Sequence, residues 1–72
     1  MLTFGIEKSE SPEICIVVDI NGIAKLRHIL EALSKSPDHA HLMTEEWGGN
    51  DLTIDGIDSN YSLINSVRIV RI

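Results

Sequence analysis

The first third of the chain carries two segments with the pattern of β-strands. In residues 2–6, Leu2, Phe4 and Ile6 alternate with small or polar residues, which is the period of a strand with one buried face. Residues 13–19 are rich in β-branched residues and apolar on both sides. That second pattern is typical of a central strand that is covered on both faces.

The period of the apolar positions changes from two to 3.6 after Asn21, which predicts an amphipathic helix. Asn21 is the expected N-cap, and the Ser-Pro-Asp run at 36–38 is the expected stop. The apolar stripe of this helix comprises Ile23, Leu26, Ile29, Leu30 and Leu33.

The second half of the chain predicts three more strands. Residues 39–47 read as one extended segment, followed by a turn at 48–51 and a short strand at 52–55. Residues 55–65 are expected to form a polar loop along an edge, and residues 67–72 to form a last strand that is apolar on both sides. In the segment 39–47, one face would carry Ala40, Leu42 and Thr44, and the opposite face His39, His41, Met43, Glu45 and Trp47.

Together these elements predict an α+β fold of two layers, with one amphipathic helix packed on a mainly antiparallel sheet of four or five strands in the order ββαβββ. Residues 1–72 form a single domain, because a chain of this length buries only about 60% of its unfolded surface. One helix cannot cover both faces of such a sheet. We therefore expect an open, apolar sheet face that mediates a homodimer or binds a partner.

The composition narrows the classes of function. The net charge of −5 disfavours nucleic-acid binding, which requires clustered Lys and Arg, so basic proteins are the expected partners. The single Cys excludes an internal disulfide framework, and no long apolar run predicts a secretion signal or a membrane span. A cytoplasmic protein with no membrane partner is expected.

Charge is distributed unevenly along the chain. No Lys or Arg lies between Ser36 and Val67. The acids of that stretch are Asp38, Glu45, Glu46, Asp51, Asp55 and Asp58. Since the only Trp of the chain lies among them, and Trp is enriched in binding hot spots, this stretch is the expected partner-binding surface. The contacts predicted there are Glu45, Glu46, Trp47 and Asp51, with His39 and His41 beside them.

Two other functions remain open from the sequence. His39, His41 and Glu45 would share one strand face and could ligate a divalent ion, although exposed histidines that bond to neighbours or water are the favoured interpretation. The chain could also be a structural subunit that assembles only with copies of itself. No nucleophile elbow, P-loop or dinucleotide-binding glycine pattern is present, so neither enzymatic activity nor a cofactor is expected.

The pattern of a β-hairpin, one helix, an H-x-H-L segment leading to E-W-G-G, and a final V-R-I-V-R-I strand resembles the small immunity proteins of bacterial polymorphic toxin systems. Among them the chain is most similar to the family called immunity protein 32. The resemblance implies a non-catalytic protein that binds a cognate toxin and blocks it. It assigns no functional residues.

Overall fold

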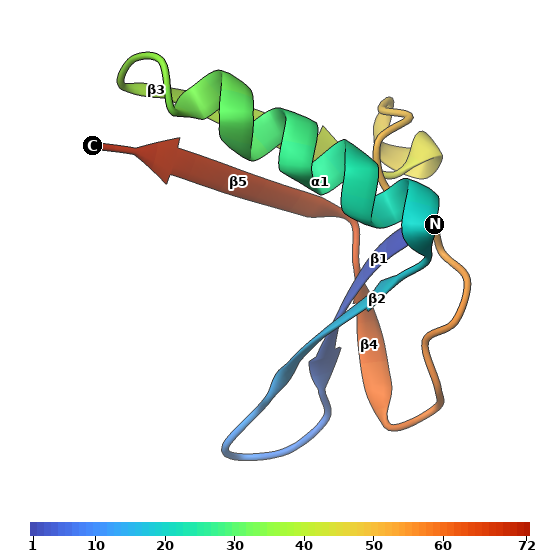
Figure 1. Cartoon of the computed structure of the whole chain (residues 1–72). Coiled ribbons are helices and arrows are strands. Elements are labelled where there is room, and N and C mark those ends of the chain that lie inside the picture. Colours follow the sequence, from blue (N-terminus) through green and yellow to red (C-terminus); the bar gives the residue numbers. More distant parts are fainter.

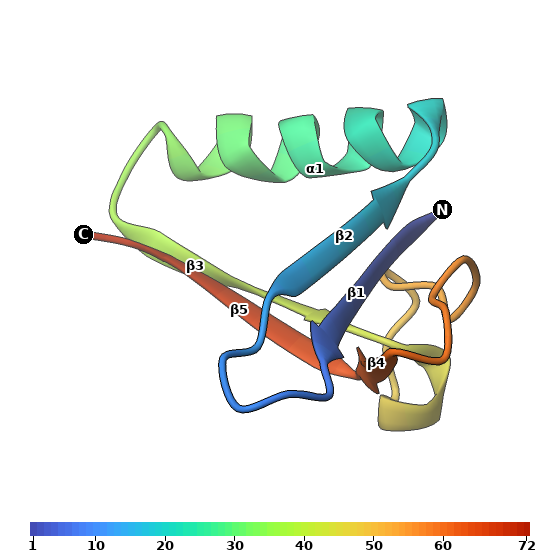
Figure 2. The same cartoon turned by 90° about the horizontal axis from the view of Figure 1, so that it is seen from below.

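The computed structural model describes residues 1–72 and has an α+β fold, with one helix packed on antiparallel sheets. Figures 1 and 2 show the helix running along one pair of strands, while the N-terminal hairpin projects away from it. The elements are, in chain order, β1 (Leu2–Glu7), β2 (Ile14–Val18), α1 (Ile20–Leu33), β3 (Asp38–Met43), the 3-10 turn η1 (Glu45–Trp47), β4 (Tyr61–Ile64) and β5 (Ser66–Arg71).

The predicted single sheet of four or five strands is not formed. The order ββαβββ is matched except that the 3-10 turn η1 is inserted between β3 and β4. The strands divide into a three-stranded sheet, β2-β1-β4, and a two-stranded sheet, β3-β5. The division occurs at Asn65, which separates β4 from β5. In one continuous strand, residues three positions apart point to opposite faces. Ile64 and Val67 nevertheless both pack on the core, so the alternation is interrupted between them.

Asn65 also anchors the junction between the two sheets. Its backbone carbonyl accepts a hydrogen bond from the Thr44 N–H at 3.0 Å, and its Oδ1 accepts one from the buried Thr44 hydroxyl at 2.7 Å. The end of β3 is thereby fixed to the point where β4 becomes β5.

The helix begins two residues earlier than predicted. Asp19 is the N-cap, because its backbone is extended and its carboxylate accepts a hydrogen bond from the Gly22 N–H at 2.8 Å, whereas Asn21 is already helical. Hydrogen bonds from the Met1 ammonium and then from Gly22 hold the pKa of the Asp19 carboxyl below its usual value. The last helical residue is Leu33.

Four predictions about the strands are wrong. The strand predicted over 39–47 ends at Met43, and the strand predicted over 52–55 is reduced to one bridge between Thr44 and Leu52. The loop predicted over 55–65 contains β4, which pairs with β1 along an edge of the sheet. β2, predicted as a central strand, is the opposite edge strand of the same sheet.

The core lies where α1 meets both sheets. Only 9 of the 72 residues are buried, and the main cluster is Leu2, Phe4, Leu42 and Leu52, with Ile29, Ile64, Val67 and Ile69 packed against it. As predicted, Leu42 points toward the helix side. No helix combines the length and apolar character needed to cross a membrane.

The sheet face away from the core is not the apolar face that the pattern predicts. The register of β3 and β5 places His39 opposite Val70 and His41 opposite Arg68 on that side. This face is therefore mixed and partly basic. Val70 is an exposed aliphatic side chain on this face, and most of the others lie on β2 and on one flank of α1.

Candidate functional site

A tight turn after β3 determines where the predicted contact residues lie. The Thr44 carbonyl accepts hydrogen bonds from the N–H groups of Trp47 and Gly49, both at 3.0 Å, so the chain curls at Glu45 instead of continuing as a strand. The strand alternation is lost there. The side chains of η1 consequently point in different directions around the turn and do not alternate between two faces of a sheet; they belong to Glu45, Glu46 and Trp47.

Both glycines after Trp47 are required by this turn, for different reasons. Gly48 is left-handed, with φ of 91°, and its N–H donates to the Glu45 carbonyl at 3.0 Å. Gly49 packs directly on the end of β3, where an added Cβ would lie 2.6 Å from the Met43 carbonyl oxygen. The Gly-Gly pair thus folds the chain back onto β3.

The segment after the turn is held against β3 and β1. The Leu52 N–H donates to the Met43 carbonyl at 3.1 Å, and the Thr53 N–H donates to the Leu2 carbonyl at 2.9 Å. The Thr53 hydroxyl accepts a hydrogen bond from the Leu2 N–H at 3.0 Å and also bonds the buried Thr3 hydroxyl. These contacts fix residues 52–53 beside η1.

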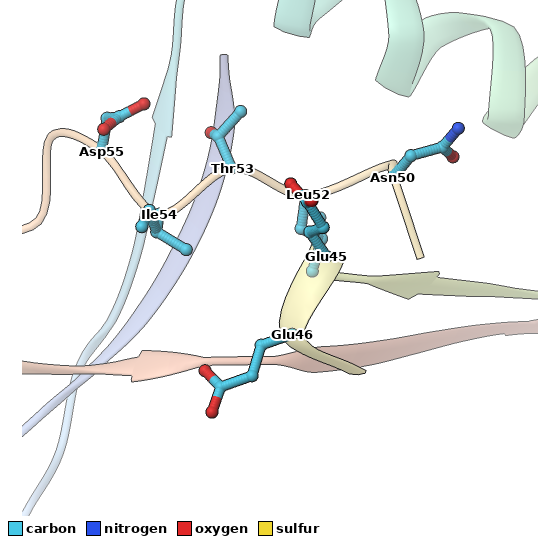
Figure 3. A pocket seen from close by; sticks show the side chains of 7 residues that line it. All are labelled: Glu45, Glu46, Asn50, Leu52, Thr53, Ile54 and Asp55. Carbon is cyan, nitrogen blue, oxygen red and sulfur yellow. The ribbon is translucent and has the colours of Figure 1, made fainter. Parts of the chain in front are cut away.

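A hollow of ≈ 700 Å³ lies between η1 and this segment, and we call it the acidic hollow. Figure 3 shows that two of its residues come from η1 and the others from the extended chain after the turn. Its lining consists of Glu45, Glu46, Asn50, Leu52, Thr53, Ile54 and Asp55. The lining therefore contains three carboxylates and no Lys, Arg or His.

The three carboxylates of the acidic hollow have no ion-pair partner within the chain. The ion pair of the structure joins the Met1 ammonium to Asp19, and the carboxylate of Asp38 contacts the imidazole of His39. Glu45, Glu46 and Asp55 are all exposed. Their negative charge is available to a ligand from solution.

Two large apolar side chains are exposed on the two segments that line the acidic hollow. Ile54 lines the hollow and is 64% exposed, and Trp47, on the same turn as Glu45 and Glu46, is 58% exposed. Trp47 therefore does not complete the core. An exposed indole beside carboxylates can contact the face of a guanidinium or ammonium group while the acids neutralise its charge.

Asp51 belongs to the same segment but faces a cation. The Lys25 ammonium donates hydrogen bonds to the backbone carbonyls of Asp51 at 3.2 Å and Asn50 at 3.4 Å. Asp51 lines a smaller hollow with Lys25 and not the acidic hollow. The stretch that lacks cations in the sequence thus receives one from α1 in the fold.

The two predicted histidines lie on β3, before the turn. Their ring centroids are 5.2 Å apart in an edge-to-face arrangement, and His39 Nδ1 lies 3.5 Å from Asp38 Oδ1. Neither residue lines the acidic hollow. Both are exposed on the mixed face of the β3-β5 sheet.

The metal-binding alternative loses its geometric basis. It required Glu45 on the same strand face as His39 and His41, but β3 ends at Met43 and Glu45 begins the 3-10 turn. No group of three or more His, Cys, Asp or Glu residues is placed to hold a metal ion.

The six acids of the cation-free stretch do not form one surface. Asp38 lies at the far end of β3, opposite Arg71, and Asp58 borders a separate hollow with Lys8. Only Glu45, Glu46 and Asp55 line the acidic hollow. Of the six predicted contacts, Glu45 and Glu46 line it, and Trp47 lies on the same turn. The other three, Asp51, His39 and His41, lie outside it.

The sequence prediction did not single out Asp55 and Ile54. Both belong to the LTID run, which was assigned to a strand, and only the fold of residues 48–53 shows that they return to the turn. The available signal was the Gly48-Gly49 pair, since two successive glycines permit a tight reversal. Comparisons of the chain with models of protein families, with curated proteins and with solved structures gave no match.

Proposed function

We propose that this chain is a non-catalytic binding protein that holds a basic partner at the acidic hollow, and that it acts as an immunity protein which blocks a cognate toxin. The proposal rests above all on one observation. Three carboxylates line a single open hollow without any internal cation, in a chain of net charge −5.

The charge of the hollow supports a basic protein as the partner. Unpaired acids beside an exposed indole offer both charge neutralisation and an apolar contact to an Arg or Lys side chain. A negative field also steers a basic partner and speeds association at low salt. A toxin that attacks nucleic acid must itself be basic around its phosphate-binding groups, so an acidic inhibitor competes directly for those cations.

The residues of the hollow support binding over catalysis. Its only hydroxyl, on Thr53, is engaged by Leu2 and Thr3. The remaining polar groups are the carboxylates and the amide of Asn50. The lining carries no thiol or amine, and its one hydroxyl is engaged, so it offers these carboxylates no free side-chain nucleophile to activate.

A basic peptide tests the binding part of the proposal. Trp47 is the only Trp, so its fluorescence reports the titration of a nona-arginine peptide. The triple variant Glu45→Gln, Glu46→Gln, Asp55→Asn should weaken binding about 20-fold at low salt, since each exposed ion pair contributes about 0.2–1 kcal/mol. Its salt dependence should also become shallower.

The matched control removes the same charge elsewhere. The triple variant Glu10→Gln, Glu31→Gln, Asp58→Asn changes exposed residues outside the acidic hollow and gives the same net charge. We expect it to weaken binding less than about threefold, because distant exposed charges are screened. An equal loss in the two triple variants would show that the peptide senses only net charge, and the hollow would not be the site.

Growth rescue tests the immunity part of the proposal. The product of the reading frame adjacent to this chain, expressed in a bacterial host, should arrest growth. Co-expression of this chain should restore growth, and co-expression of the acidic-hollow triple variant should not. A neighbouring product without toxicity, or full rescue by the triple variant, would refute this part.

A further inference from the structure

The strand β2 is apolar on both faces, yet it forms an outer edge of its sheet. On one face Ile14 and Ile16 are 52% and 47% exposed, and Val18 is also exposed. No strand pairs with the outer edge of β2. Natural edge strands usually carry a charge, a proline or a bulge that prevents pairing, and residues 14–18, ICIVV, contain no charged residue and no proline.

One flank of α1 also exposes apolar side chains. Ile23 and Leu30 are 46% and 50% exposed and lie seven residues apart, on one stripe of the helix. Lys25 lies on the opposite flank, where it contacts the loop at residues 50–51. The apolar flank therefore faces away from that loop. We call Ile14, Ile16, Val18, Ile23 and Leu30 the β2-α1 face.

The surface area of the chain is larger than that of an average compact monomer of the same mass. A monomeric protein of 8.0 kDa exposes about 4450 Å², whereas this chain exposes 5121 Å², about 670 Å² more. Its radius of gyration is 12.7 Å, against about 11 Å for a compact chain of this length. The excess approaches the surface of about 800 Å² that each partner buries in a standard protein interface.

We propose that a second copy of this chain covers the β2-α1 face, with the two β2 strands paired antiparallel about a two-fold axis. The sheet then has six strands in the order β4-β1-β2-β2-β1-β4. β2 becomes a central strand, which is the position that its two-sided apolar pattern predicts. The conflict between the pattern of β2 and its place in the single chain disappears in the dimer.

The strand is self-complementary in this arrangement. Pairing centred on Ile16 places Ile16 opposite its own copy, Ile14 opposite Val18, and Cys15 opposite Val17, so every cross-strand pair is apolar. At the ends Glu13 meets Asp19. The Asp19 carboxylate is already bonded by the Met1 ammonium and the Gly22 N–H, which reduces the repulsion between these acids.

Sedimentation equilibrium tests the dimer, with Ile16→Lys as the disrupting variant. Two lysines would face each other at the two-fold axis, and we expect the dimer dissociation constant to rise about 100-fold or more. The control is Ile54→Lys, which changes an isoleucine that is 64% exposed outside the β2-α1 face and should leave the constant unchanged. A wild-type chain that stays monomeric up to about 1 mM, or a dimer that Ile16→Lys does not weaken, overturns the proposal.

Cross-linking tests the same interface in a variant that retains an apolar β2. In a Cys15→Ser background, Ile16→Cys places two thiols opposite each other, with Cα atoms about 4.5–5.5 Å apart, within the range for a disulfide. Mild oxidation should give a covalent dimer, whereas Cys15→Ser with Ile54→Cys should not. A wild-type dimer whose β2 thiols fail to cross-link would use another face, and the proposal would be wrong. The acidic-hollow triple variant should dimerise normally, so the two proposals fail separately.

Discussion

Replacing Gly49 by alanine should destabilise the fold more than the same replacement at Gly48, although only Gly48 of the two has a positive φ. A Cβ on Gly48 meets nothing within 4 Å. A Cβ on Gly49 would lie 2.6 Å from the carbonyl oxygen of Met43 and 2.7 Å from its Cβ. Relief of that contact requires the turn to separate from β3, because both neighbours belong to the strand.

The magnitudes follow from these two environments. At Gly48 the left-handed conformation costs an alanine roughly 1–2 kcal/mol, and the stiffer unfolded chain offsets about 0.4–1 kcal/mol, so a net loss of about 1 kcal/mol is expected. At Gly49 overpacking costs about 1–3 kcal/mol, weakening the Leu52 hydrogen bond to Met43 adds about 1 kcal/mol, and the stiffer unfolded chain again offsets about 0.4–1 kcal/mol. The expected loss there is about 1–3.5 kcal/mol, centred near 2 kcal/mol.

Urea unfolding followed by far-ultraviolet circular dichroism, at one fixed protein concentration, measures both losses. With a slope of about 1 kcal/mol per molar urea, the Gly48→Ala midpoint should fall by about 1 M and the Gly49→Ala midpoint by about 2 M. Gly48→Asn should recover most of the loss at that position, because Asn tolerates the left-handed conformation. If Gly49→Ala proves as stable as Gly48→Ala, the turn does not pack on the Met43 carbonyl as described.

Two further predictions concern the core and a surface hydrogen bond. Leu42→Ala should lower the free energy of unfolding by about 2–5 kcal/mol, because Leu42 is buried in the core. Ile72→Ala, at a fully exposed position, should change it by less than about 0.5 kcal/mol. Similar urea midpoints for the two variants would contradict the assignment of Leu42 to the core. The Tyr61 hydroxyl donates a hydrogen bond to the Glu13 carboxylate at 3.1 Å, which raises the pKa of Tyr61 above its ordinary value of 10.0. Glu13→Gln should bring this pKa back toward that value. Absorbance at 295 nm measures the titration, because the chain has only one Tyr. Because the pKa is raised in the folded state, the associated stability is complete below about pH 10 and is lost as pH rises through the folded-state pKa; an unchanged titration in Glu13→Gln would show that this hydrogen bond is not its cause.

Much of the fold was predictable wherever one residue pattern persisted over a whole element. The alternation at Leu2, Phe4 and Ile6 and the 3.6-residue period of α1 each reflect burial of one face, and the structure confirms both elements. Leu42 was also predicted correctly to face the helix side. Local periodicity is sufficient in such cases, because a single buried face fixes the pattern.

The predictions failed where a backbone hydrogen bond or a distant segment overrides the local pattern. β3 was predicted to continue through Trp47, but Thr44 captures the N–H groups of Trp47 and Gly49 and ends the strand. β4 was assigned to a loop because Tyr61 to Ile64 is short and polar in part, and it forms through its pairing with β1. Neither contact leaves a signal in the segment itself.

The candidate site was predictable in part for the same reasons. The cation-free stretch, the Gly-Gly turn and the only Trp are features of the sequence, and they led to Glu45, Glu46 and Trp47. Which charged residues lie close together in space, however, depends on where the chain reverses direction, and the composition does not show this. The fold therefore added Asp55 to the site and placed Lys25 against Asp51.

The sequence alone determined that the chain folds into an aliphatic α+β domain with a net negative charge. The period of the apolar residues reveals each helix or strand locally, and the net charge is a sum over residues that does not depend on the fold. Only the tertiary structure decided which three acids share a hollow, that the strands divide at Asn65, and that the most apolar strand lies at an edge. These outcomes depend on which segments meet in space. Pairing between distant segments is set by the whole chain and by no single stretch of it.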